Sequence, residues 1–372
     1  MSITPVRRGP RRALAICICS LLFAAWPLIF PALALADGDD ACAKTACVDL
    51  ESCIKYWGCR AMMCQAEPGG FSFPSKAPDD DSRPCGDGDM TLFNGLLCAA
   101  GDKRGCDGVA EAQNPQTGEW SRSPRYERLG RYDGAASFSP DMALGVQLYL
   151  VKTRDVDRAM KWVNWLEEIV PCYITIKGVC FWRGIPAFCR QPSCVMRPGD
   201  AASLASTVRY LQANAGMAAL PNGNLKRYLH DFGGSPSLSS AIGALVNKPG
   251  YSQHLVGVNV LLLQLMGGSN FLSEDAAYLL DKKNPGNAFY SYLNKAGGEQ
   301  VTKQILARCP PSHPLTPPLS QWQWERANSD EAWKKSCYWD CVFMAEMING
   351  PLEQYAWRGL DKKTDDLAMK PR

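Results

Sequence analysis

Residues 138–170, FSPDMALGVQLYLVKTRDVDRAMKWVNWLEEIV, decide the fold. In Ser139-Pro140-Asp141, an N-cap residue precedes a first-turn proline and an acid that suits the positive end of a helix dipole, so a helix should begin here. Apolar residues then recur at helical spacing over 142–150, and again over 160–166. The short link between these two runs predicts an antiparallel pair of helices.

The same signals recur along the rest of the chain. They predict further helices over 200–216, 237–246, 252–266, 273–283, 287–295, 299–307 and 329–348. Strand-forming residues gather in 173–177 and 179–182, which should form a short hairpin between Cys172 and Cys180. We therefore expect an all-α fold made mainly of helical hairpins. The absence of a sequence repeat of fixed period disfavours an open solenoid.

The first 36 residues resemble a cleaved secretory signal. Four arginines precede an apolar run over 13–35, which ends in the small-residue site Ala34-Leu35-Ala36. An uncleaved membrane anchor is the alternative, and Pro27 and Pro31 within the apolar run argue against it. The pair Arg11-Arg12 also leaves a twin-arginine export route open. We expect a periplasmic or secreted protein.

The charge balance argues against a nucleic-acid partner. The chain has 40 basic and 37 acidic residues, and residues 1–36 contain four arginines and no acid, so the mature chain has a net charge of about −1. No later apolar stretch reaches the roughly 20 residues that a membrane-spanning helix needs. We therefore expect no integral membrane segment after signal cleavage.

Cysteines point to an oxidising compartment. Of the 17 cysteines, 15 follow residue 36, and an exported chain with so many is expected to pair them, with one left over. Cys98 and Cys106 should close a short loop. We divide the chain into a signal peptide (1–36), a cysteine-rich subregion (37–86) that relies on disulfides for order, a helical main domain (87–351) and a C-terminal tail (352–372).

The first group of candidate site residues is Asp87-Gly88-Asp89, with Asn94 on the helix that follows. Carboxylates on a glycine-rich approach to a helix can transfer a proton, bind a sugar hydroxyl or help to hold a divalent cation. Alternatively, Asp89 caps the helix and Asp87 is solvated. We assign Asp89 a catalytic role and Asp87 and Asn94 a role in substrate binding.

A second group of candidates lies between two predicted helices. Arg122 and Arg125 could each bind a carboxylate of an acidic substrate in a bidentate manner, with Asp141 nearby at the next helix start. The alternative is a surface loop with local ion pairs. Loops of this composition often line clefts, so we assign all three to substrate binding.

The third group is the tryptophan-rich segment 320–341. Sugars stack on aromatic rings while carboxylates bind their hydroxyls, and a glycosidase needs two carboxyl groups at the scissile bond. Glu325 and Asp340 are therefore candidate catalytic residues, and Trp322, Trp324 and Trp339 candidate sugar platforms. The alternative for Trp333 and Trp339 is that they anchor the last helix in the core.

Only three histidines are present, which excludes a histidine-rich zinc site, and we expect no metal ion or other cofactor. His254 is a candidate general base or substrate contact, although a lone histidine more often has a structural role. The chain lacks the G-x-S-x-G, P-loop and G-x-G-x-x-G motifs, so the standard hydrolase elbow and nucleotide-binding loops are absent.

Helix pairs with acids and aromatics on their connections resemble the (α/α)-toroid, six-hairpin carbohydrate enzymes. The residues behind the resemblance are Asp87-Gly88-Asp89, Arg197-Pro198-Gly199-Asp200 and Gln323-Trp324-Glu325, and it covers roughly residues 90–351. It is a likeness of architecture and points to no one family. A lyase of this type uses a His or Tyr base near an Asn, which here implies His254, Tyr251 or Asn259.

These observations favour an exported glycoside hydrolase or polysaccharide lyase. Its catalytic carboxylates would be Asp89, Glu325 and Asp340 in a tryptophan-lined cleft, and its partner a poly- or oligosaccharide. A non-catalytic secreted protein that binds glycans or a cell-envelope component is the main alternative. A structural or toxin-like interaction protein that uses the cysteine-rich part is a third.

Overall fold

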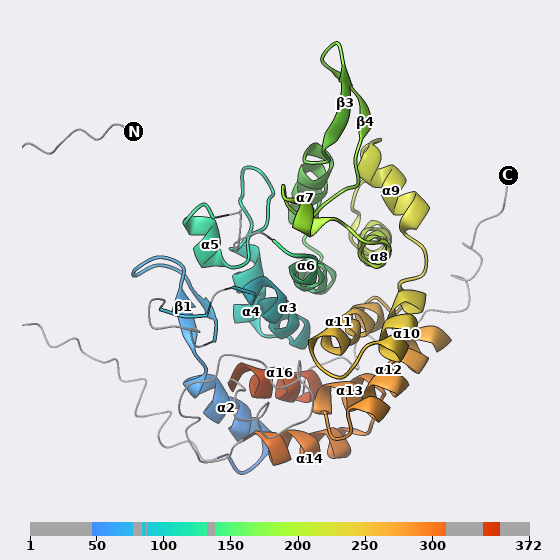
Figure 1. Ribbon diagram of the computed structural model, residues 1–372. Coiled ribbons are helices and arrows are strands. Elements are labelled where there is room, and N and C mark those ends of the chain that lie inside the picture. Colours follow the sequence, from blue (N-terminus) through green and yellow to red (C-terminus); the bar gives the residue numbers. More distant parts are fainter. Residues whose placement is uncertain (1–46, 77–83, 87, 132–137, 310–337, 350–372) are drawn as a thin grey trace, which may run out of the picture.

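The computed structural model describes residues 47–76, 84–86, 88–131, 138–309 and 338–349 (Figure 1). This part of the chain is mostly helical, with two small two-stranded sheets. Every cysteine in it is disulfide-bonded, and the predicted Cys98–Cys106 bridge is confirmed. None of the helices in the described ranges is long and apolar enough to cross a membrane.

The N-terminal part contains a helix, α2 (Leu50–Arg60), and a small sheet of β1 (Met63–Gln65) and β2 (Ser72–Pro74). Asp49 and Ser52 form a capping box that starts α2. Trp57 and Phe73 are fully buried in the same core as the rest of the protein. This part therefore packs on the main body, and α2 lies against the last described helix.

The predicted helix pair over 138–170 is confirmed as α6 (Pro140–Thr153) and α7 (Val156–Glu168). Before it come three helices: α3 (Met90–Ala100), α4 (Lys103–Ala110) and α5 (Pro124–Arg128). Ser139 occupies the N-cap of α6 as expected, but its side chain makes no capping hydrogen bond. The start of α6 therefore depends on the first-turn proline.

The predicted β-hairpin is confirmed as β3 (Cys172–Ile176) and β4 (Val179–Arg183), bridged by the Cys172–Cys180 disulfide. Lys177 and Gly178 form its turn, with φ values of 51° and 81°. Two consecutive residues of positive φ are typical of a tight type I′ hairpin turn. Figure 1 shows the hairpin projecting from the body beyond α7 and α9.

The remaining helices are α8 (Pro198–Ala215), α9 (Asn224–Phe232), α10 (Pro236–Val246), α11 (Tyr251–Leu265), α12 (Phe271–Lys283), α13 (Ala288–Leu293), α14 (Gly298–Arg308) and α16 (Tyr338–Asn349). Seven of these helices correspond to predicted ones, whereas α9 was not predicted, and residues 329–337 of the last predicted helix lie outside the described residues. A short 3-10 turn, η2 (Pro192–Cys194), precedes α8. The N-cap of α12 is Asn270 and not a residue near Ser273, because Ser273 is the partner of Asn270 in a capping box.

The most buried helices form a closed circuit of contacts. α3, all of whose residues are buried, packs against α6 and α16, while α6 packs against α8 and α11, and α11 against α13. Phe289 of α13 and Phe343 of α16 complete the circuit, with ring centroids 5.7 Å apart. A helix that is apolar on all sides needs neighbours on all sides, which explains why α3 and α16 lie inside.

Two glycines let α3 and α6 cross in backbone contact. A Cβ atom on Gly95 would collide with the backbone of Gly145, and one on Gly145 would collide with the backbone around Thr91. Further along, the Lys152 ammonium donates to the carbonyl of Ala99 at 3.3 Å. The contacts advance in the same direction along both helices, so α3 and α6 run parallel and begin at the same end of the molecule.

We predict that Gly95→Ala destabilises the protein by about 1–3 kcal/mol, because the added methyl group forces two helix backbones apart. Gly58→Ala is the matched control. Gly58 lies in α2 with nothing within 4 Å of an added Cβ, so this change should be neutral or stabilise by up to about 1 kcal/mol. Urea unfolding with the disulfides intact measures both; equal midpoints for the two variants would contradict the close crossing.

Candidate functional site

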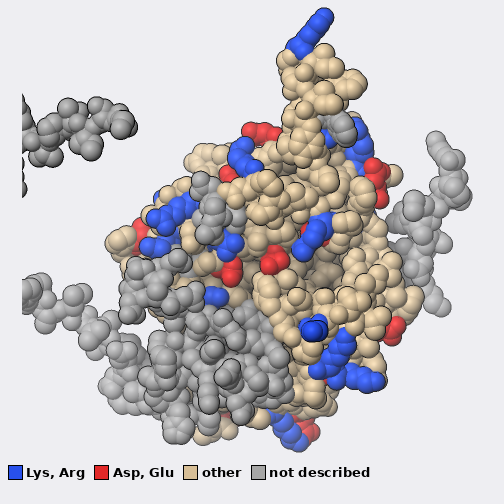
Figure 2. Space-filling view, viewed as in Figure 1, with Lys and Arg blue, Asp and Glu red and all other residues tan. Residues whose placement is uncertain are grey.

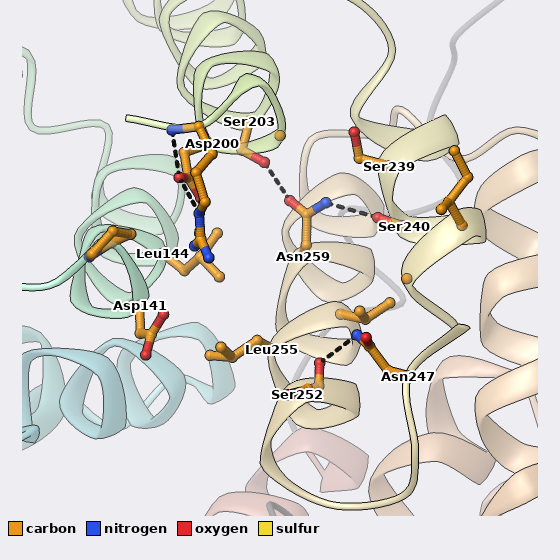
Figure 3. A pocket seen from close by; sticks show the side chains of 16 residues that line it. Asp141, Leu144, Asp200, Ser203, Ser239, Ser240, Asn247, Ser252, Leu255 and Asn259 are labelled. Atoms are coloured by element: carbon orange, nitrogen blue, oxygen red, sulfur yellow. Dashed lines mark hydrogen bonds and ion pairs between the residues drawn. The ribbon is translucent and has the colours of Figure 1, made fainter. Parts of the chain in front are cut away.

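A cavity of about 510 Å³ lies between α6, α8, α10 and α11 (Figure 3). Its size falls in the range of small-molecule sites, roughly 300–1,000 Å³. Figure 2 shows acidic and basic side chains near the middle of the face that is not covered by grey atoms, beside a hollow in the surface. Part of its polar lining, including Asp141, Asp200 and Ser252, comes from the first turns of α6, α8 and α11.

The starts of α6, α8 and α11 meet at one end of the cavity. The Tyr251 hydroxyl, in the first turn of α11, donates to Asp141 Oδ2 in the first turn of α6 at 3.1 Å. Charges on Arg197 and Asp200, at the start of α8, also act on Asp141. Deeper in, Thr207 of α8 donates to Gln147 of α6 at 3.0 Å, so these helices run parallel too. Positive helix-dipole ends therefore converge here.

Asp141 is a carboxyl of this cavity whose environment favours the protonated form. Burial raises its pKa above the usual value, and the negative charges of Asp89 and Asp200 raise it further. The hydrogen bond from Tyr251 and the charge of Arg197 act in the opposite direction and are outweighed. A partly buried carboxyl that retains its proton more readily is typical of a general acid.

Two arginines bind the neighbouring carboxylates. Arg197 holds Asp200 through two hydrogen bonds, 2.8 Å from Nε and 3.1 Å from Nη2, and the Arg197 amide adds a third at 2.9 Å. Arg122 Nη1 lies 2.9 Å from Asp89 Oδ1 and 3.0 Å from the carbonyl oxygen of Gly88. Asp89 occupies the N-cap position of α3 but makes no capping hydrogen bond, because its side chain turns to Arg122.

Side-chain amides and hydroxyls form the wall opposite Asp141. Ser203 of α8 donates to Asn259 Oδ1 at 2.6 Å, and Asn259 Nδ2 donates to Ser240 of α10 at 2.7 Å (Figure 3). This chain of bonds fixes the orientation of the Asn259 amide. Further polar lining comes from Ser239, Asn247 and Ser252, while Leu144, Leu255 and Val256 supply apolar surface. The combination suits a ligand that carries hydroxyl groups on an apolar ring.

Four of the predicted site residues are in the interior. Asn94, His254, Trp339 and Asp340 have essentially no exposed surface, and none of them lines the cavity. A side chain without exposed surface cannot contact a substrate in this conformation. Their placement therefore does not support the predicted substrate contacts, nor a catalytic role for Asp340.

Trp339 and His254 pack within the core instead. The indole Nε1 of Trp339 donates to the carbonyl of Met62 at 2.7 Å, and the Arg104 guanidinium lies 4.6 Å from its ring centroid. Trp339 thus ties α16 to the N-terminal part, as the alternative interpretation proposed. The His254 ring packs near those of Tyr251 and Phe289, with centroids 6.3 Å and 5.7 Å away.

Among the other described site residues, Asp141 lines the cavity, whereas Asp89, Arg122 and Arg125 do not. The charge of Asp89 nevertheless acts on Asp141, while Arg125 lies in α5. Asp87, Glu325, Trp322 and Trp324 lie outside the residues that the structure describes. Within the described ranges, no cluster of His, Cys, Asp and Glu side chains could hold a metal ion.

The sequence did not reveal the serine residues of the cavity. Ser203, Ser239 and Ser240 belong to helices whose starts and apolar spacing were recognised, but serine is common on helix surfaces and carries no signal of its own. Tyr251 and Asn259 were considered only for the lyase variant. Their place at the cavity follows from the packing of α8, α10 and α11, which the sequence does not specify.

No protein-family model matches the chain, and comparisons with characterised proteins and with solved structures give no significant match.

We predict that Asp141→Asn gains stability over the wild type as the pH rises. Burial raises the folded-state pKa of Asp141, so its carboxyl contributes most to stability below its unfolded pKa of about 3.9, and this contribution is lost as the pH rises through the folded pKa. Asparagine does not titrate. Urea unfolding of both proteins between about pH 4 and pH 7 measures the difference in the free energy of unfolding.

Asp275→Asn is the matched control, because it removes a carboxyl exposed on α12. Tyr251→Phe removes a hydrogen bond that lowers the pKa of Asp141, and it should extend the fall in stability to higher pH. A difference between Asp141→Asn and the wild type that stays constant with pH would contradict the burial of this carboxyl.

Proposed function

We propose that this protein is an exported carbohydrate-active enzyme that cleaves a glycosidic bond in the cavity between α6, α8, α10 and α11. The observation that carries the proposal is Asp141, a partly buried carboxyl with a raised pKa beside a cavity lined by hydroxyl and amide groups. A protonated carboxyl next to groups that bind hydroxyls is what protonation of a glycosidic oxygen requires.

The reaction uses two carboxyl groups in different environments. Asp141 donates its proton to the leaving-group oxygen as the glycosidic bond breaks, and Asp89 is the second carboxylate, held by Arg122. Water supplies the new hydroxyl group. The separation between the carboxyl groups around the bound sugar then decides whether Asp89 activates that water directly or first forms a covalent intermediate.

The arrangement of helices supports an (α/α)-toroid-like architecture. In this proposal α3, α6, α8, α11, α13 and α16 form the inner ring and their sequence neighbours the outer one. Support comes from the burial of the inner helices, the circuit of contacts between them and the parallel direction of α3, α6 and α8. Such a ring collects helix starts at one face, where the candidate site lies.

We propose a periplasmic or secreted location, in keeping with the signal predicted over residues 1–36. Six disulfides have both partners within the described ranges, among them Cys64–Cys85 and Cys309–Cys341. Structural disulfides on this scale are typical of oxidising compartments. Glu325, Trp322 and Trp324 remain candidates for further substrate contacts.

A glycan-binding protein without catalysis is the second candidate. It is favoured by the ion pairs that hold Asp89 and Asp200, since these acids then serve to fix helix starts. It would use the same cavity and the same hydroxyl groups. The two functions differ only in whether the bound saccharide is cleaved.

We predict that Asp141→Asn lowers the rate of saccharide cleavage by about 100-fold or more, as expected for loss of a general acid, and that Asp89→Asn does the same. The measurement is reducing-sugar release from a panel of envelope polysaccharides, with Glu325→Gln in parallel. Asp275→Asn should keep the wild-type rate. Binding without product release by the wild type would favour the glycan-binding alternative, and full activity in Asp141→Asn would refute this site.

A second prediction tests the cavity itself and applies to either function. Ser239 lines the cavity from an exposed position on α10, so Ser239→Trp should fill part of it and weaken saccharide binding about tenfold or more. Leu238→Trp places the same indole one residue away, outside the lining, and should bind as the wild type does. Isothermal titration of saccharides bound by the wild type provides the measurement, and equal affinity in both variants counts against the cavity.

A further inference from the structure

The β3–β4 hairpin is the most exposed apolar feature among the described residues. Every residue of β3 is exposed, and Tyr173, Val179 and Phe181 are 68%, 70% and 76% exposed. Ile174 and Ile176 are also exposed. Isolated apolar side chains on a surface are ordinary, but a contiguous apolar group of this kind marks an interaction site.

The apolar surface extends around the hairpin. Successive side chains of a strand point to opposite faces, so full exposure of β3 means that both faces meet solvent. A protein partner that docks on a sheet covers one face or one edge. An apolar surface on both faces is better suited to a solvent that surrounds the whole hairpin, such as the outer part of a lipid bilayer.

The hairpin is also built to hold its shape outside the core. The Cys172–Cys180 disulfide joins its strands, and the Lys177-Gly178 turn closes it tightly. Lys177 has a positive φ, which asparagine, aspartate or glycine adopt more readily, so local folding does not explain a lysine here. Figure 2 shows a basic side chain at the tip of this projection, above residues without charge.

The charge of the surrounding segment has one sign. Residues 171–189 include Lys177 and Arg183 and contain no Asp or Glu, whereas Arg197 further along the chain is ion-paired with Asp200. The mature chain as a whole is close to neutral, so this segment is a local excess of positive charge. Basic residues beside an apolar tip favour a surface that combines hydrocarbon with anionic headgroups.

We infer that the β3–β4 hairpin inserts its apolar residues into an anionic lipid surface and holds the protein there peripherally. Ile176, Val179 and Phe181 enter the outer acyl region. The long side chain of Lys177 at the turn reaches back to the lipid phosphates, and Arg183 at the base contacts them directly. Exposed isoleucine and valine distinguish this from a sugar platform, because sugars stack on aromatic rings. The hairpin does not line the cavity.

Vesicle flotation tests the inference with the full mature chain. Vesicles of equal parts phosphatidylcholine and phosphatidylglycerol should carry the wild-type protein upward, and vesicles of phosphatidylcholine alone should carry much less. The double variant Ile176→Ser with Phe181→Ser should lower the partition coefficient at least about tenfold, because it removes two apolar side chains from the inserted tip. Lys177→Gln should reduce binding most at low salt.

Leu245→Ser is the matched control, because Leu245 is an exposed apolar residue of α10, 63% exposed, outside the hairpin. It should float as the wild type does, and all variants should unfold at the wild-type temperature. Three outcomes would overturn the inference: equal flotation of the double variant and the wild type, equal flotation with neutral vesicles, or self-association of the wild type without lipid that the double variant abolishes.

Discussion

The backbone contact between α3 and α6 at Gly95 and Gly145 is the constraint on which the site depends. Because two helices in such contact cannot slide past one another, the contact sets their relative register. Asp89 precedes Gly95 by six residues and Asp141 precedes Gly145 by four, along parallel helices. The register therefore brings both carboxyl groups to the same end of the molecule, and α8 and α11 add Asp200 and Tyr251 beside them.

Three carboxyl groups that lie close together repel one another, and the three have different hydrogen-bond partners. Asp89 and Asp200 each bind a guanidinium, from Arg122 and Arg197, whereas Asp141 binds the neutral phenol of Tyr251. Burial and the nearby negative charges then favour the protonated form of Asp141. The difference in partners sets Asp141 apart from Asp89 and Asp200, and the proposed function depends on this difference.

Much of the fold could be predicted from local signals, whereas the composition of the site could not. Helix starts such as Pro140, the hairpin at 172–183 and the Cys98–Cys106 bridge depend on residues close in sequence. The candidate site depends on which helix starts meet. Asp141 was predicted only as a substrate contact, and Asp340 as catalytic. A carboxylate near tryptophans has the same sequence pattern whether its helix is buried in the core or exposed at a cleft. Burial of α16 decides that question, and burial is a tertiary property.

The most direct measurement is a crystal structure of the mature protein soaked with a mixture of short oligosaccharides. We expect a saccharide in the cavity between α6, α8, α10 and α11, with one of its oxygens within hydrogen-bond distance of the Asp141 carboxyl and its hydroxyls on the Asn259 side. A saccharide bound at another surface, with this cavity holding only solvent, would contradict this expectation.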